Sequence, residues 1–248
     1  MNNDLNLQKE NNNNIDQLKK DIKEELSKIK QDYNKKIIDY KNIYNLNEHL
    51  KEIKIQKNEK INNIIDLFTI EYLFFFRILI IKGKSQRIII LQILRNCIEI
   101  NPLFSKKMID AMFPIVLCRI YEDTKNSAFE ERYECLKLFK TWLNLSDNNF
   151  PIIFSQNLVS LSKIDDPFKI GCIEFLRQIS IYRPDICSSV GGFKILISSL
   201  LEETLPKNLL NKILCSLIYI INTTNKRKYF NGFGDLYKIF SIFTKSDF

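Results

Sequence analysis

Side chains that commonly carry enzyme chemistry are scarce in this sequence of 248 residues. Its one histidine, His49, lacks a cysteine or carboxylate cluster at metal-ligand spacing, so it is interpreted as a solvated side chain. Lys82-Gly83-Lys84-Ser85 resembles the end of a phosphate-binding loop, but the first glycine of that motif would fall at Ile78, and a helix rather than a strand precedes it. We therefore expect a protein that is not an enzyme, with no catalytic residue, no metal site and no cofactor.

Six cysteines are spread along the chain, and they are Cys97, Cys118, Cys135, Cys172, Cys187 and Cys215. They form no Cys-x-x-Cys pair, and most lie among apolar residues at helical spacing. Residues 1–14 are polar and lack the apolar core of a secretory signal. The thiols are therefore predicted to be reduced core side chains of a cytosolic protein.

A basic and aromatic turn, Lys226-Arg227-Lys228-Tyr229-Phe230, is the candidate surface for a partner. Its three adjacent cations suit an acidic peptide, a phospholipid headgroup or a nucleic-acid phosphate. In the structural alternative, the cations are solvated at a helix C-terminus, where they favour the helix dipole, and the two aromatic side chains pack in the core. A second candidate, Gly191-Gly192 with Lys194 nearby, could hold an anion, but a sharp turn between helices is the favoured interpretation.

The segments that must position these residues have the pattern of short helices. Three segments in the last third, 168–182, 193–201 and 209–221, are apolar at helical spacing with almost no strand signal between them. The apolar positions that predict a buried face in the last segment are Leu210, Ile213, Leu214, Leu217, Ile218 and Ile221. Helices this short cannot bury a wide apolar face alone, but a stacked array of helical hairpins can.

Turn signals divide the rest of the chain in the same way. The predicted helices are 61–81 (one or two helices), 85–100, 105–122, 127–145, 149–163, 167–182, 192–203, 207–224 and 232–245. The predicted fold class is all-α, an armadillo/HEAT-like α-solenoid preceded by a charged coiled-coil helix. The apolar run 67–81 is too short and too charged to span a bilayer, so it is interpreted as a buried helix.

The N-terminal segment differs from the solenoid. Residues 1–14 are predicted to be a disordered, Asn-rich tail, and residues 15–59 a charged coiled-coil helix or hairpin. The apolar positions of this segment step by three and four, and they are Ile15, Leu18, Ile22, Leu26, Ile29, Tyr33, Ile37 and Tyr40. So narrow a stripe is typical of a coiled coil or of a helix lying on a partner. A break at 45–47 would let 50–55 fold back, in an arrangement similar to GTPase-binding hairpins.

Residues 132–248 resemble the N-terminal domain of the Rictor/Pianissimo family, a subunit of target-of-rapamycin complex 2. The order and spacing of short motifs carry this resemblance, and the motifs are Glu131-Arg132, Pro184-Asp185, Gly191-Gly192-Phe193, the basic turn, Asp235-Leu236, Phe243 and Asp247-Phe248. Gln86-Arg87 and Leu94-Arg95 fit more loosely and extend the resemblance upstream, so the domain is assigned to 60–248. Glu131 and Arg132 are also expected to link neighbouring helices.

The resemblance implies a non-catalytic scaffold and regulatory subunit that supports assembly of target-of-rapamycin complex 2 and phosphorylation of AGC kinases of the Akt type. It links the chain to the cytoskeleton and to chemotactic signalling. The implied partners are the target-of-rapamycin kinase, the other complex 2 subunits and AGC kinases. The implied location is the cytoplasm and the periphery of the plasma membrane. Family members are much longer, so the chain is expected to be a fragment or a truncated gene product.

The formal charge of +8 is spread along the chain. It suits an acidic partner or weak contact with an anionic membrane, and a lysine-rich solvated surface has the same balance. The alternative function is an effector of a small GTPase of the Rho family, in which a helical binding segment precedes armadillo repeats. Nucleic-acid binding is disfavoured, because the lysines are scattered rather than arranged in a stripe.

Overall fold

The computed structural model describes residues 2–35, 39–56, 59–83, 86–123, 125–146 and 149–229, with 234, 237 and 241. Every regular element in these residues is a helix, so the predicted all-α class is confirmed. The chain divides into two compact units, unit 1 (Met1–Asn149) and unit 2 (Phe150–Phe248). None of the described helices is both long and apolar enough to cross a membrane.

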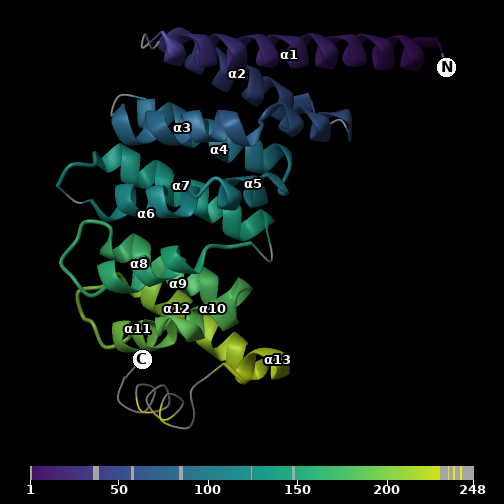
Figure 1. The fold of residues 1–248 in the computed structure, drawn as a ribbon. Coiled ribbons are helices and arrows are strands. Elements are labelled where there is room, and N and C mark those ends of the chain that lie inside the picture. The colour runs from purple at the N-terminus through teal and green to yellow at the C-terminus, as the bar shows by residue number, and fades with distance from the viewer. Residues whose placement is uncertain are drawn as a thin grey trace. The chain divides into compact units, whose positions relative to one another are not determined.

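Unit 1 is a stack of helical layers. Its elements are α1 (Asn2–Asn34), α2 (Tyr40–Gln56), the 3-10 helix η1 (Glu59–Leu67), α3 (Ile70–Lys82), α4 (Arg87–Ile100), α5 (Phe104–Asp110), α6 (Phe113–Glu122) and α7 (Phe129–Leu145). Figure 1 shows how they succeed one another: α1 packs on α2, α2 on α4, and α4 on α7. Each layer covers an apolar face of the layer before it, which is the construction of an α-solenoid.

Helix α4 is the centre of unit 1 because it packs against both α2 and α7. Consecutive residues such as Ile90 and Leu91, or Ile93 and Leu94, are all fully buried in it. Neighbouring positions on a helix point in directions about 100° apart, so a helix that buries both must be covered on more than one side. The aliphatic run of α4 therefore reflects its position between two other helices.

The N-terminal segment is a helical hairpin whose apolar stripes face into unit 1. Residues Ile15, Ile22 and Leu26 of α1 are at most 1% exposed, and α1 contacts α2, η1 and α3. The stripe is therefore buried within the chain itself. The predicted break at 45–47 is wrong, because those residues lie inside α2. The first helix of the hairpin, α1, ends earlier in the chain, at Asn34.

Helix α1 also includes residues 2–14, for which the sequence predicts a disordered tail. Extending an existing helix adds one hydrogen bond for each residue that is ordered, whereas starting a helix is costly. An Asn-rich segment of low helix propensity can thus continue the helix that the buried stripe of α1 has already nucleated. The predicted position Ile37 lies outside the described residues.

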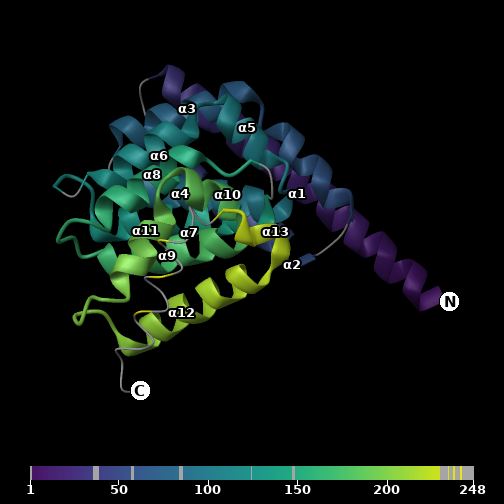
Figure 2. The same ribbon diagram turned by 90° about the horizontal axis from the view of Figure 1, so that it is seen from below.

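Unit 2 is organised around one helix, α9. Its elements are α8 (Ile152–Leu161), α9 (Lys169–Tyr182), α10 (Pro184–Ser189), α11 (Gly192–Ser199), α12 (Lys207–Asn222) and α13 (Thr224–Arg227). Helices α8, α10, α11 and α12 all pack on α9. The rings of Phe150, Phe154 and Phe175 form part of its core, with centroids 5.5–6.4 Å apart. Figure 2 shows α12 lying along α9, with α13 at its C-terminal end.

Several predicted boundaries differ from the structure. The single helix predicted at 105–122 is two helices, α5 and α6, which meet at Met112 in a left-handed conformation with φ of 61°. The predicted turn after residue 182 contains α10, with Pro184 at its first position, where a missing N–H costs nothing. Gly191 has a φ of 76°, which confirms that this glycine pair makes a turn. The helix predicted at 232–245 lies almost entirely outside the described residues.

The buried face of α12 is narrower than its sequence predicts. Ile213 and Leu217 are fully buried, as predicted, and the neighbouring Leu209 and Ile220 are buried too. In contrast, Ile218 is 39% exposed. The remaining predicted positions, which are only half-buried, are Leu210, Leu214 and Ile221. Helix α12 packs mainly on α9, so one stripe of its surface is enough to make that contact.

Candidate partner-binding surface

Two of the three predicted site residues hold helix ends. Lys226 donates from Nζ to the carbonyl oxygen of Ile181 at 2.7 Å, and the same Nζ lies 4.9 Å from the ring centroid of Tyr219. Arg227 donates from Nε to the carbonyl oxygen of Ile221 at 3.1 Å. Both carbonyls belong to the last turn of a helix, α9 or α12, where backbone acceptors have no partner within the helix.

Lys228 differs from the other two cations. Its side chain is exposed, and its Nζ lies 5.1 Å from the ring centroid of Tyr229. The Tyr229 carbonyl accepts a hydrogen bond from the Ser188 hydroxyl at 2.9 Å, which attaches this turn to α10. The three cations are thus not equivalent: Lys226 and Arg227 stabilise the end of unit 2, and Lys228 points to solvent. Phe230 lies outside the described residues.

A groove of about 330 Å³ lies between α9 and α12, beside Lys226. Its lining residues are Arg177, Ile181, Asn211, Lys212, Cys215, Ser216 and Tyr219. On α12, three of them follow one another at intervals of four residues, so they form a single wall. Sequence patterns did not reveal this groove, because its other wall belongs to α9, which is distant along the chain.

Glu174, the carboxylate that pairs with Arg177 of the groove, is already neutralised. Glu174 accepts hydrogen bonds from Nε and Nη2 of Arg177 at 2.8 and 2.7 Å, and one from Gln178 at 3.2 Å. Burial raises the pKa of Glu174, but these hydrogen bonds and the charge of Lys212 outweigh burial and hold its pKa below the ordinary value. Arg177 also donates to the Ser216 hydroxyl at 3.0 Å and so joins α9 to α12.

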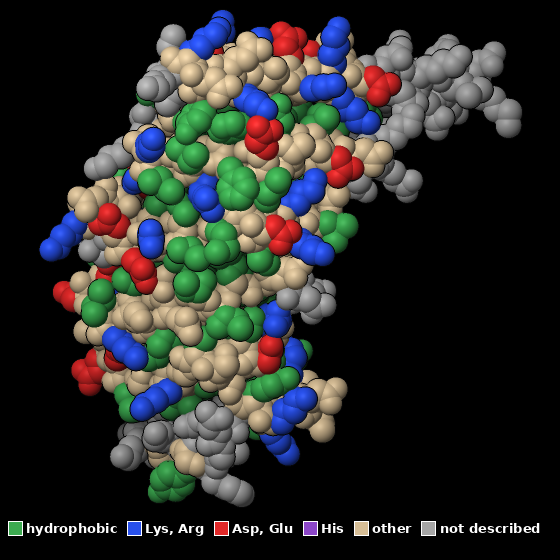
Figure 3. Space-filling model, viewed as in Figure 1, with side chains coloured by type: hydrophobic (Ala, Val, Ile, Leu, Met, Phe, Trp, Pro, Cys, Tyr) green, Lys and Arg blue, Asp and Glu red, His purple; other side chains and the backbone are tan. Residues whose placement is uncertain are grey.

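The sequence carries one signal for this surface, which is the distribution of acidic residues. Residues 204–229 contain no Asp or Glu, but they contain five cations, Lys207, Lys212, Lys226, Arg227 and Lys228. Residues 72–98 likewise contain five cations and no Asp or Glu, whereas on the face drawn in Figure 3 basic and acidic side chains are interspersed with hydrophobic ones. The segment that forms α12 and α13 therefore carries an excess of positive charge.

The cysteines divide into two kinds. Five are buried, as predicted, whereas Cys215 is exposed on α12, where the prediction of a core thiol is wrong. Burial raises the pKa of the Cys118 thiol to about 12, and burial likewise raises the pKa values of Cys97, Cys135 and Cys187 above their ordinary range. Cys215 is exposed and lines the groove, so it is the thiol there that a reagent can reach. The form that reacts is the thiolate.

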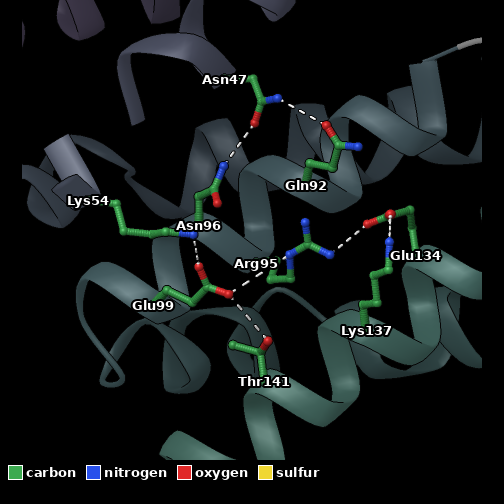
Figure 4. Close-up of polar contacts among 9 residues, drawn as sticks. All are labelled: Asn47, Lys54, Gln92, Arg95, Asn96, Glu99, Glu134, Lys137 and Thr141. Carbon is green, nitrogen blue, oxygen red and sulfur yellow. Dashed lines mark hydrogen bonds and ion pairs between the residues drawn. The ribbon is translucent and has the colours of Figure 1, made fainter. Parts of the chain in front are cut away.

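The most connected polar side chains of unit 1 join helices to one another. Asn47 of α2 donates to Gln92 at 3.1 Å and accepts from Asn96 at 3.0 Å, both on α4. From α4, Arg95 donates to Glu134 of α7 at 2.8 Å. Figure 4 shows the continuation of this network through the Glu134–Lys137 and Lys54–Glu99 ion pairs and through Thr141. These polar groups hold the layers in register.

Glu131 and Arg132 link neighbouring helices, as predicted. Glu131 pairs with Arg87 at 3.2 Å, which connects α7 to the start of α4. Arg132 donates from Nε to the carbonyl oxygen of Tyr121 at 2.8 Å, which connects α7 to the last turn of α6. Both side chains are buried, so these contacts are part of the core of unit 1.

The other residues considered for chemistry in the sequence are His49 and the segment 82–85. His49 is half-buried in α2 rather than solvated, because α2 packs on α4, and its Nδ1 has no hydrogen-bond partner within the described part of the chain. Gly83 caps α3, donating to the carbonyl oxygen of Leu79, as expected for a connection between helices; Lys84 and Ser85 lie outside the described residues. The described residues contain no cluster of metal-ligating side chains.

Comparison with known proteins identifies the family. Residues 55–247 match the family model described as rapamycin-insensitive companion of mTOR, N-terminal region. Protein pianissimo A of Dictyostelium discoideum is 28% identical over 142 residues, which is 57% of this chain and 12% of that protein. No solved structure matches the chain. Since the family match covers both units and most of the sequence, the chain belongs to the Rictor N-terminal family.

Proposed function

We propose that this chain is the N-terminal scaffold region of a Rictor-type subunit in target-of-rapamycin complex 2, and that it acts by binding rather than by catalysis. The family match over residues 55–247 is the observation that carries this proposal. The aligned segment is 12% of the length of the pianissimo relative, so the activity of a whole protein is part of the proposal.

The contacts between helices support a scaffold role. Pairs such as Arg87–Glu131 and Arg95–Glu134 use charged side chains to join α4 to α7. A stack of helices joined in this way offers an extended and rigid surface to other proteins. Its partners would be the target-of-rapamycin kinase and the other complex 2 subunits, and it would help to present Akt-type AGC kinases for phosphorylation. It would act in the cytoplasm and at the periphery of the plasma membrane, in cytoskeletal and chemotactic signalling.

The alternative of a Rho-family GTPase effector rests on the N-terminal segment, and no finding favours it. The hairpin of α1 and α2 buries its apolar stripes inside unit 1, with Ile22, Leu46 and Leu50 fully buried. The stripe that suggested a binding segment is thus already occupied within the chain.

The test is affinity purification of the tagged chain from its own cells, with mass spectrometry of the proteins that copurify. We expect the target-of-rapamycin kinase together with its complex 2 subunits. A matched bait carrying Leu94→Asp, which disrupts the core of unit 1, should lose them. Recovery of small GTPases without the kinase would support the alternative, and recovery of neither would contradict the scaffold proposal. Turnover of a substrate by the purified chain would contradict the non-catalytic part.

A further inference from the structure

We propose that the groove between α9 and α12 binds an acidic segment of a partner protein, with an apolar side chain of that segment in the groove and its carboxylates against Lys212 and Lys226. The groove would have this role in whichever complex the chain joins. Its failure to bind such a segment would therefore leave the scaffold function intact.

The shape and lining of the groove suit a side chain of a protein. Its volume of about 330 Å³ is at the small end of ligand pockets, enough for one or two side chains. Ile181 and Cys215 supply apolar surface, and the ring of Tyr219 is 51% exposed beside them. The ring is held in place by the ammonium of Lys226, which also bonds to α9. Half-exposed, immobilised tyrosines are typical centres of protein interfaces.

The charge of the groove specifies an acidic ligand. Arg177 and Lys212 line the groove and act on one carboxylate, Glu174, which Arg177 binds through two hydrogen bonds. The ammonium of Lys212 has no hydrogen bond within the described part of the chain and shares the charge of Glu174 with Arg177, while Lys226 bonds to a neutral carbonyl, so a net positive charge remains. Complementary charge strengthens and orients association across such a surface.

Two other anionic ligands fit the geometry less well. Membrane binding favours several large apolar side chains that protrude together, whereas Tyr219 is the one exposed large apolar side chain among the residues that line the groove. Nucleic-acid binding at physiological salt requires several phosphate contacts, but Arg177 is already paired with Glu174 and Arg227 with the Ile221 carbonyl. A protein segment uses both the few free cations and the apolar floor.

Fluorescence anisotropy with synthetic peptides and the purified chain tests the ligand chemistry. The probe is a short fluorescein-labelled peptide of Asp and Glu with one central Phe. We expect saturable binding that weakens with salt, and weaker binding when Ser replaces the Phe or Lys replaces the acids. Equal binding of the acidic peptides with Phe and with Ser would overturn the role of the groove, and absence of binding would overturn the proposal.

Charge reversals locate the binding surface. Lys212→Glu should weaken binding of the peptide about tenfold, because it replaces an attraction by a repulsion at the wall of the groove. The matched control is Lys194→Glu, an exposed lysine on α11 outside the groove, which should change binding less than about twofold. If Lys212→Glu fails to fold by circular dichroism, Lys212→Ala replaces it, with a smaller expected loss. Equal binding by variant and control would contradict the proposal.

The exposed thiol of the groove reports occupancy directly. Alkylation of Cys215 by a maleimide should be slowed by the acidic peptide, and Cys215→Ser identifies its signal against the buried thiols. Peptide binding without protection of Cys215 would place the peptide elsewhere and overturn the proposal. Protection by anionic phospholipid vesicles or by a single-stranded oligonucleotide, but not by the peptide, would replace the proposed partner with a membrane or a nucleic acid.

Discussion

The contact of α4 with α7 in unit 1 and that of α9 with α12 in unit 2 use charged side chains differently. Between α4 and α7, Arg95 and Arg87 bind carboxylates of the opposite helix, and Glu134 and Glu131 are at least nine-tenths buried. In the contact of α9 with α12, Arg177 and Glu174 form an ion pair within α9. Arg177 reaches α12 through a hydrogen bond to the Ser216 hydroxyl.

The two contacts also differ in what covers them. Helix α4 is covered by both α2 and α7, so its charges must be paired, because an unpaired buried charge is costly. Helix α12 keeps one side open, so cations such as Lys212 persist there at little cost. Charges paired across helices thus accompany the covered contact of α4 with α7, and the open side of α12 carries a cation without such a pair.

The largest expected effect comes from the centre of unit 1. Leu94→Asp places a carboxylate at a fully buried position of α4, and it should destabilise unit 1 by several kcal/mol. The matched change on the open side of α12, Ile218→Asp, should cost less than about 1 kcal/mol, because Ile218 is 39% exposed. Urea unfolding followed by circular dichroism measures both. Similar losses for the two variants would show that α12 is covered as completely as α4.

Alkaline pH should destabilise unit 1 more than unit 2. Unit 1 contains Cys97, Cys118 and Cys135, whose pKa values are raised by burial, whereas in unit 2 burial raises the pKa of Cys187. A thiol whose pKa is higher in the folded state stabilises the fold fully below the unfolded pKa, and this contribution is lost as pH rises towards the folded value.

Between pH 8 and 9.5 the loss should be on the order of 1 kcal/mol for each buried thiol, since an unfolded thiol titrates near 8.5. The measurement is urea unfolding as a function of pH, with Cys135→Ala as the variant that removes one titrating group. If Cys135→Ala leaves the decrease of the unfolding free energy with pH unchanged, this decrease does not come from the Cys135 thiol.

Removing a carboxylate should cost more stability at the contact of α4 with α7 than at the contact of α9 with α12. Glu134→Ala removes the carboxylate that pairs with both Arg95 and Lys137 and leaves Arg95 with the longer contact to Glu99 at 4.0 Å, and we expect a loss of about 2 kcal/mol. Glu174→Ala, in unit 2, should cost about 1 kcal/mol, because Arg177 retains its bond to Ser216 and lies beside the open groove. Exposed Glu130 on α7 supplies the control, and Glu130→Ala should be nearly neutral. A lower denaturant midpoint for Glu174→Ala than for Glu134→Ala would contradict the comparison of the two contacts.

The smallest effects should come from the predicted site residues themselves. Lys226→Ala removes the bond that joins the end of α12 to α9, and it should destabilise unit 2 by about 1 kcal/mol. Arg227→Ala removes a bond within one exposed helix end and should cost about 0.5 kcal/mol or less. Lys228→Ala should leave thermal stability unchanged, and a shift in Tm for this variant as large as for Lys226→Ala would contradict the distinction among the three cations.

The local pattern of the sequence was sufficient for part of this result. Spacings of three and four predicted the helices, and the order of motifs such as Glu131-Arg132 and Gly191-Gly192 indicated the family that the match over 55–247 confirms. The local pattern gave a wrong prediction where one signal is compatible with two structures. A proline after α9 begins α10 instead of a loop, and a narrow apolar stripe on α1 is covered by its own chain.

The sequence by itself determined most of the helical segments, because helix formation depends on residues three and four positions apart; it missed α10, the break between α5 and α6, and the start of α1. The tertiary structure alone decided which faces of those helices are covered. It buries both sides of α4 between α2 and α7, leaves Ile218 and Cys215 of α12 exposed, and brings Arg177 of α9 to the same groove as Lys212. The physical reason is that burial and charge pairing depend on neighbours from distant parts of the chain, and no local spacing encodes them.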